Sequence, residues 1–290
     1  MASQAPRFWQ TRRGRDRTYR ATMLVLLCTF GAVFLLPFYW SLVASVSSIG
    51  DVYSSPPRFW PTEFHFENYL KAMTVLPFHR FIFNSVYICL CCVTGQVLCA
   101  SLVAYGFARL HFRGRNVWFM ILLATMMLPG QVTMIPHYQI FRYLGWLDSF
   151  KPLIVPSFLG GAQGAFYIFL MRQFFKTIPM ELEEAARLDG CSNLRVFWDI
   201  MIPLSMPAVA TICVLCFIQH WQDFMNPLIY LTSFERFPVS LGLQMFQSIH
   251  GGKPHYMLAA SNITLLPILV IFFAAQRYFV EGITLTGMKG

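Results

Sequence analysis

The chain has 290 residues and a formal net charge of +9; 56% of its residues are hydrophobic and only 12% are charged. A soluble domain carries about 25% charged residues, so this composition excludes an ordinary soluble protein and predicts an all-α polytopic membrane protein. The positive charge does not indicate nucleic-acid binding, because the basic residues gather at the ends of apolar runs, as in membrane proteins.

Residues 1–20 are basic and polar, and we expect this cytoplasmic segment to contact anionic membrane lipid. The first apolar run follows at about 21–46 and is longer than the core of a signal peptide. We therefore interpret it as a spanning helix, with a cleaved signal peptide as the alternative. Lysines and arginines are more frequent on the side that holds the N-terminus, which predicts that both termini are cytoplasmic.

A spanning helix needs about 20 mostly apolar residues. Six runs meet this requirement within a transmembrane domain over 21–290, at about 21–46, 84–108, 116–136, 151–173, 204–231 and 256–280. The third run is interrupted by Pro129-Gly130 and again by Pro136. Broken helices at membrane depth need protein or a water-filled cavity beside them, so this run is either a kinked packing helix or a wall of a transport path.

The segment 176–203 is charged and lies between two apolar runs, and its pattern predicts two short helices. Pro179 suits a first helical turn, Gly190 suits the left-handed residue that ends a helix, and Ser192 can cap the next one. Pro203 is expected to end the second helix. Its apolar face is predicted to comprise Leu194, Phe197, Trp198 and Met201. The pattern alone allows either a docking surface or an ordinary amphipathic loop helix.

This segment resembles the EAA loop of ABC-transporter permeases. The matching residues are Glu184-Ala185-Ala186, Gly190, Ile200, Ile202 and Pro203. Ile202 replaces a leucine that is common in the family, and Cys191 stands where alanine is usual.

The resemblance covers nearly the whole chain and is to the carbohydrate-uptake branch, the permeases similar to the second membrane subunit of the maltose transporter. The motifs that carry it are Phe66-Glu67-Asn68-Tyr69, Asn84-Ser85, Ala104 to Arg109, Met127 to Val132 with Ile135-Pro136, Pro179 to Pro207, Glu281-Gly282 and Gly287 to Gly290. The family usually has Trp-Asn in the fifth span, where this chain has Trp221-Gln222.

The resemblance implies the permease fold of type I ABC importers, with six transmembrane helices and a cytoplasmic coupling helix. It also implies a bacterial or archaeal cytoplasmic membrane, a second permease in a heterodimer, two cytoplasmic ATPase subunits that hold ATP and magnesium, and an extracytoplasmic solute-binding protein. The residues expected to couple to the ATPase are Glu184, Ala185, Ala186, Arg187, Asp189, Gly190, Ile200 and Pro203.

Polar residues inside spans are costly and indicate functional sites. The candidates for a substrate path are His220, Trp221, Gln222, Asp223, Asn226, Gln131 and Asn262. Amides and a carboxylate suit sugar hydroxyls, and an aromatic face suits the C–H surface of a sugar ring. The alternative is that these side chains hydrogen-bond neighbouring helices.

No catalytic residue, metal site or cofactor is expected on this chain. It lacks the GxxxxGK[ST] phosphate loop and the HExxH and GxSxG motifs, and its CxxC, Cys213 to Cys216, has no second ligand pair. Other cargo remains open, namely a glycerophosphodiester or a sugar phosphate. An ion-coupled secondary transporter is a further alternative, but Asp223 alone gives it little support.

Overall fold

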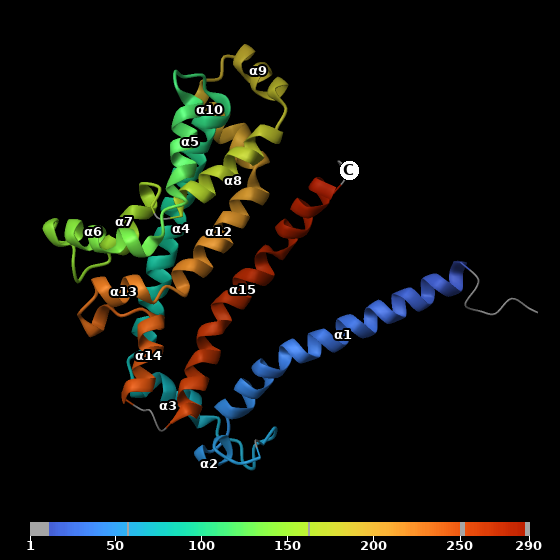
Figure 1. Ribbon diagram of the computed structural model, residues 1–290, viewed down its shortest axis with the longest axis vertical. Helices are drawn as coiled ribbons and strands as arrows, with labels where there is room; N and C mark the ends of the chain where they lie inside the picture. The colour runs from blue at the N-terminus through green and yellow to red at the C-terminus, as the bar shows by residue number, and fades with distance from the viewer. Residues whose placement is uncertain (1–11, 57, 162, 250–252, 288–290) are drawn as a thin grey trace, which may run out of the picture. The chain divides into compact units, whose positions relative to one another are not determined.

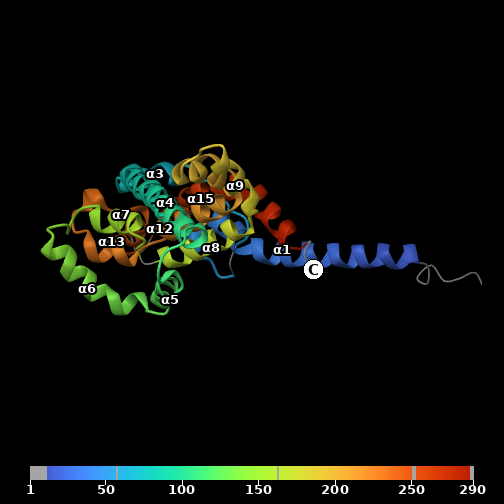
Figure 2. The same ribbon diagram turned by 90° about the horizontal axis from the view of Figure 1, so that it is seen from above.

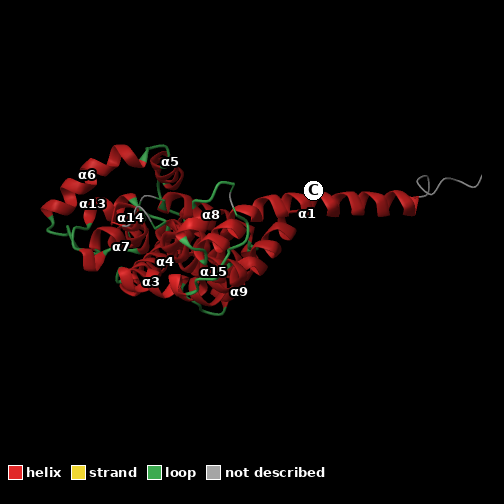
Figure 3. Cartoon of the chain, turned by 90° about the horizontal axis from the view of Figure 1, so that it is seen from below, coloured by secondary structure: helices red, strands yellow, loops and turns green. Residues whose placement is uncertain are grey.

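The structure, a computed structural model, describes residues 12–56, 58–161, 163–249 and 253–287. Every regular element within these ranges is helical, as Figure 3 shows. The all-α class is therefore confirmed for the described residues. The chain divides into two compact units, Met1–Ala72 with Gly251–Asn262 and Met73–His250 with Ile263–Gly290.

The first unit contains α1 (Arg12–Ser45), α2 (Ile49–Val52), most of α3 (Glu67–Val75) and the beginning of α15 (Pro254–Gly287). The side-chain amide of Asn68 is buried and donates to the carbonyls of Ser45 at 3.0 Å and Ser47 at 3.1 Å. The start of α3 is thereby fastened to the end of α1.

The second unit is arranged around α4 (Phe78–Arg109), which packs against several other helices of the unit. Figure 1 shows α8 and α12 along α4, and Figure 2 shows α5 and α6 on one side of the unit. Its other elements, besides the remainder of α15, are α5 (Arg115–Thr125), α6 (Gly130–Tyr143), α7 (Lys151–Phe158), α8 (Gly164–Thr177), α9 (Met180–Leu188), α10 (Asn193–Val196), the π-helix η2 (Phe197–Met201), α11 (Ile202–Leu204), α12 (Met206–Trp221), α13 (Met225–Tyr230), the 3₁₀-helix η3 (Phe234–Arg236) and α14 (Val239–Ile249).

The main core of this unit lies where α4, α8 and α12 meet. Ala100 and Ala104 on α4 are fully buried with Met171 on α8 and Ile212 on α12. Alanine lets helix backbones approach closely, and the larger side chains fill the remaining space. The core therefore holds together helices that are distant in the sequence.

Among the described residues, three helices are long and apolar enough to cross a membrane, Tyr19–Ser45, Phe78–Arg109 and Pro254–Gln276. Two further bent pairs meet the same test, which makes up to five candidate spans if each pair is counted as one. The pair Arg115–Thr125 with Gly130–Tyr143 bends by 96°, and Asn193–Leu204 with Met206–Trp221 bends by 77°. A count of six spans stays a prediction.

The fourth expected run, 151–173, is not one continuous helix. The helix ends at Phe158 and resumes at Gly164. Gly160 adopts a left-handed φ of +78°, and the Gly161 N–H donates to the Pro156 carbonyl at 2.7 Å. These two glycines turn the chain between the two helical parts of the run.

The third run is broken at one of its two expected positions. Pro129 stands just before α6 in an extended conformation, and α5 ends at Thr125. Pro136, in contrast, lies inside α6 and does not end it. The expected second interruption is therefore wrong.

Candidate functional site

The helix α9 ends as its sequence predicts. Gly190 has a left-handed φ of +82°, and its N–H donates to the Arg187 carbonyl at 3.0 Å. The Cys191 N–H donates to the Ala186 carbonyl at 2.9 Å. These two bonds form a Schellman motif, which satisfies carbonyls that a helix end leaves free. The glycine stop is confirmed.

The second helix of the segment begins at Ser192, whose hydroxyl accepts from the Arg195 N–H at 3.4 Å. The expected cap is confirmed. Its buried face includes Val196, Phe197 and Met201. The expectation that Leu194 and Trp198 lie on this face is wrong, since their side chains are 66% and 50% exposed. The helix passes into a π-helical turn at Phe197, which shifts the register of the residues that follow.

The residues predicted to couple to an ATPase lie on a mainly exposed surface at one end of the second unit, near the α9 label in Figure 1. Leu188 at the end of α9 is 89% exposed. Ala186 is buried and Ile200 is half-buried, while the exposed members are Glu184, Ala185, Arg187, Asp189, Gly190 and Pro203. The surface therefore combines charges with an apolar tip, a composition that suits a protein partner.

An ion pair beneath α9 was not singled out by the sequence. Glu183 Oε1 lies 2.7 Å from Arg109 Nε, and each side chain is only 4% exposed. Arg109 also donates from Nη2 to the carbonyls of Phe175 at 2.7 Å and Ile178 at 2.5 Å. Arg187 approaches the other Glu183 oxygen at 3.7 Å. The first turn of α9 is thus fastened to the end of α4.

A cavity of about 150 Å³ lies between the helices α4, α6, α7, α12 and α13 and is also lined by Gly161 and Gln163, which precede α8. Three of the predicted substrate-path residues, His220, Asp223 and Asn226, line it. Asp223 Oδ2 accepts from the Asn226 side-chain amide at 2.8 Å, and Oδ1 accepts from its backbone N–H at 3.2 Å. Both residues therefore also help to begin α13.

The other predicted substrate-path residues lie elsewhere. Trp221 is buried against Cys89 and Phe217, and its indole N–H donates to the Thr264 carbonyl at 3.1 Å. Asn262, in the first unit, accepts from the Ser41 hydroxyl at 2.9 Å. Gln131 and Gln222 are exposed and do not line this cavity.

The cavity contains a residue that the sequence did not single out. Gln96 on α4 is 3% exposed, and its Nε2 has no hydrogen-bond partner among the described residues. The only sign of it in the sequence is that a polar residue stands in the middle of an apolar run, where polar side chains are costly.

Two loops of the second unit meet at Asp148. Its carboxylate accepts from the backbone N–H of Thr232 at 3.0 Å and of Ser233 at 2.8 Å, and also from the Ser233 hydroxyl. Arg236 Nη1 lies 2.6 Å from Asp148 Oδ2. Hydrogen bonding from the Ser233 hydroxyl is the largest cause that lowers the pKa of Asp148 to about 2.

The motif Asn84-Ser85 holds the other end of the loop that contains Ser233. The Asn84 amide donates to the carbonyls of Glu235 at 2.9 Å and Phe237 at 3.0 Å. The Ser85 hydroxyl accepts from the Val239 N–H at 2.9 Å. The start of α4 therefore anchors the loop that precedes α14.

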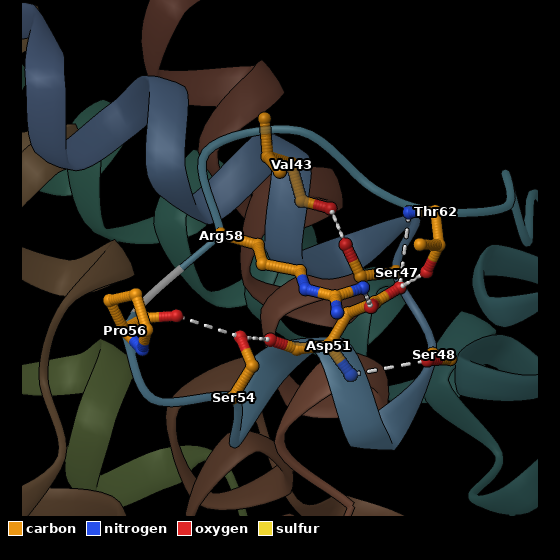
Figure 4. Close-up of polar contacts among 8 residues, drawn as sticks. All are labelled: Val43, Ser47, Ser48, Asp51, Ser54, Pro56, Arg58 and Thr62. Atoms are coloured by element: carbon orange, nitrogen blue, oxygen red, sulfur yellow. Dashed lines mark hydrogen bonds and ion pairs between the residues drawn. The ribbon is translucent and has the colours of Figure 1, made fainter.

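In the first unit, Asp51 organises the loop that follows α2 (Figure 4). Its carboxylate pairs with Arg58 at 2.8 Å and accepts from the N–H and the hydroxyl of Thr62. The Thr62 hydroxyl is the largest cause that lowers the pKa of Asp51. The Ser48 hydroxyl accepts from the Asp51 N–H and so caps the start of α2.

Comparison with known proteins identifies the family. Residues 96–284 match the model of the binding-protein-dependent transport system inner membrane component. This chain belongs to that family. The matched region of this permease contains both the α9 segment and all the cavity-lining residues.

The permease is similar to proteins that transport chemically different solutes. It is 32% identical to the arabinooligosaccharides transport system permease of Halalkalibacterium halodurans, over 80% of this chain and 82% of the relative. It is 31% identical to the sn-glycerol-3-phosphate transport system permease of Yersinia enterocolitica, over 94% of this chain and 98% of the relative.

Among solved structures, the permease resembles a chain of a bacterial ABC transporter involved in the import of the acidic polysaccharide alginate. The TM-score is 0.80 at 27% identity, with 93% of this chain and 98% of that chain covered. The fold is therefore that of an ABC importer permease. The named solutes of these three proteins are a neutral oligosaccharide, a phosphate ester and an acidic polysaccharide, so similarity does not select one cargo.

Proposed function

We propose that this chain is one permease subunit of an ATP-driven, binding-protein-dependent ABC importer that carries a sugar or oligosaccharide across the cytoplasmic membrane of a bacterium or archaeon. The observation that carries the proposal is the match to a chain of the alginate importer over 93% of this chain. The similarity to the arabinooligosaccharide permease supports a carbohydrate cargo.

The proposed machine has further components. A second, different permease forms a heterodimer with this chain, and two cytoplasmic ATPase subunits bind ATP and magnesium. An extracytoplasmic binding protein delivers the solute, membrane lipid surrounds the assembly, and both termini of this chain are cytoplasmic.

In this proposal the exposed surface of α9 is the part that an ATPase subunit moves. Glu184 and Arg187 set its orientation, and Leu188 enters an apolar part of the ATPase groove. The buried contact of Glu183 with Arg109 carries the displacement from α9 to α4, because two paired charges without access to water resist separation. Since α4 also lines the cavity through Gln96, movement at one end of the unit can change the shape of the cavity.

Charge reversal on α9 tests the coupling. We expect Glu184→Lys to leave membrane insertion intact and to reduce ATP-dependent sugar uptake at least about tenfold, because the variant places a repelling charge in the docking surface. Glu181→Lys is the matched control, since Glu181 is an exposed acid on the same helix outside the motif. Uptake is measured with radiolabelled sugars in membrane vesicles that contain the whole transporter. Normal uptake by correctly inserted Glu184→Lys protein would remove this residue from the coupling surface.

The assembly is tested by purification of the chain from its native host in mild detergent. Recovery of a second permease and an ATPase is the expected result. A chain that is recovered alone, and that transports without ATP, would instead identify an ion-coupled transporter.

A phosphate-bearing cargo is the second candidate, because the glycerol-3-phosphate permease is 31% identical. The lining of the cavity disfavours it: the described lining residues include the acid Asp223 and neither lysine nor arginine. Phosphate recognition in proteins typically uses arginine, lysine or helix N-termini.

A further inference from the structure

The cavity lies where two helices of the second unit are interrupted. The chain leaves helical conformation between Phe158 and Gly164 and again between Trp221 and Met225. Gly161 and Asp223, one in each interruption, both line the cavity. Inside a membrane, non-helical backbone persists only where protein or a water-filled space receives its polar groups. The two breaks therefore place polar groups in the wall of this cavity, which we call the chamber.

Gln96 gives the chamber an unused hydrogen-bond donor. The residue lies in the middle part of α4, it is almost completely buried, and its Nε2 meets no acceptor among the residues described. Gly164 faces it: a Cβ atom at that position would lie 3.2 Å from Nε2. A buried amide without a hydrogen-bond partner destabilises the fold. We therefore infer that Gln96 meets a partner from outside this chain, because packing alone would favour an apolar side chain at this position.

The remaining lining suits hydroxyl groups. Gln163, Gln219 and Asn226 add amides, and Asp223 adds a carboxylate that accepts hydrogen bonds. The Tyr167 hydroxyl donates to Gln219 Oε1 at 3.0 Å and so orients that amide. The ring of Phe141 adds an apolar wall against which the C–H face of a sugar ring can pack.

Charge and size restrict the ligand further. An anion here would face the Asp223 carboxylate, and the described lining offers it no lysine or arginine, only the imidazoles of His137 and His220. The volume of about 150 Å³ is below the roughly 300–1,000 Å³ of pockets that enclose a whole small molecule. The chamber can therefore hold one edge of a sugar ring, while the remainder of the sugar lies outside the chamber.

We propose that this chamber binds the hydroxyl edge of one neutral sugar residue during transport, with Gln96 donating a hydrogen bond to a hydroxyl oxygen and Asp223 excluding anionic sugars. The inference rests on the proposed function and extends it: this subunit contacts the cargo itself, and the cargo is a neutral carbohydrate.

The test uses the permease–ATPase complex purified from the native host into lipid nanodiscs, without the soluble binding protein. Saturation-transfer difference NMR measures the affinity of the neutral probes arabinobiose, maltose and cellobiose and of the acidic probe digalacturonate. We expect at least one neutral probe to bind the unmodified complex more tightly than digalacturonate does. Gln96→Met should weaken that binding about fivefold, the effect of one lost hydrogen bond.

The matched control is Ser101→Ala, which removes from α4, outside the chamber, a buried hydroxyl that likewise has no partner among the described residues. It should leave the affinity unchanged. Asp223→Asn should raise the affinity for digalacturonate about fivefold, and a gain of binding cannot result from misfolding.

Three outcomes would overturn the inference: no neutral probe binds, Gln96→Met binds as the unmodified complex does, or digalacturonate binds more tightly than the neutral probes before any substitution. ATP-dependent uptake by the same preparation, with the binding protein restored, separates the two proposals. If uptake is intact but the Gln96 result fails, only the chamber is wrong. If no sugar is taken up with ATP, the proposed function fails.

Discussion

At the scale of single residues, the contact between Glu183 and Arg109 is the most consequential one in the α9 segment. Both side chains are buried, and Arg109 also donates to the backbone carbonyls of Phe175 in α8 and of Ile178, which follows α8. A buried charge that loses its partner is strongly destabilising, whereas an exposed pair contributes little. The position of α9 therefore depends on this pair more than on any exposed charge around it.

Removal of the acid should reveal this dependence. We expect Glu183→Ala to lower the free energy of unfolding by about 3–5 kcal/mol, because Arg109 is left buried and unpaired. The matched control is Asp199→Ala, which breaks the exposed pair of Asp199 with Arg195 on the same segment and should cost less than about 1 kcal/mol. Denaturant titration of the purified protein in detergent measures both. Equal effects of the two substitutions would show that Glu183 does not fasten α9.

At the scale of elements, Asp148 joins the loop between α6 and α7 to the loop between α13 and α14. Its pKa is lowered to about 2, chiefly by the Ser233 hydroxyl, with further lowering by backbone N–H groups and Arg236. The folded protein therefore favours the ionised carboxylate. The resulting stability is fully present above the ordinary pKa of 3.8 and is lost as the pH falls toward about 2.

The pH dependence can be measured directly. At neutral pH, Asp148→Asn should lower the thermal midpoint by a few degrees, because the charge-assisted bonds to Ser233 and Arg236 are lost. The difference from the unmodified protein should shrink as the pH falls from about 4 to about 2, since Asp148 is then protonated in both states. Glu235→Gln, an exposed acid in the same loop, is the control and should show no such gap. A gap that stays constant over this pH range would contradict the assignment.

At the scale of the whole molecule, α4 organises the larger unit. Gly95 on this helix touches Phe158 of α7 so closely that a Cβ atom would lie 2.5 Å from the ring. Gly106 on the same helix has nothing within 4 Å of the equivalent position. Close packing therefore requires glycine at position 95, whereas position 106 has room for a larger residue.

We expect Gly95→Ala to destabilise the protein by about 1–3 kcal/mol, because the added methyl group overpacks the contact with α7. Gly106→Ala should be neutral or stabilising by up to about 1 kcal/mol, since alanine is the better helix former. Thermal midpoints of the two purified variants test this. A Gly95→Ala protein as stable as Gly106→Ala would mean that α7 does not pack closely on α4.

Local sequence determined much of this protein. Long apolar runs require helices, so the all-α class and the long helices that include 21–45, 84–108 and 256–276 follow from composition and length. The ends of the α9 segment also follow from local chemistry, since Gly190 tolerates a left-handed conformation and Ser192 caps a helix. The role of this segment in coupling stays a prediction.

Tertiary structure decided the rest. Periodicity does not reveal that Glu183 meets Arg109, that Gln96 faces Gly164, or that Trp221 turns away from the chamber toward Thr264. The two members of each pair are far apart in the sequence, by 43 positions for Trp221–Thr264, 68 for Gln96–Gly164 and 74 for Arg109–Glu183. Hydropathy treats each helix by itself, whereas the partner of a buried polar group is set by which helices pack together.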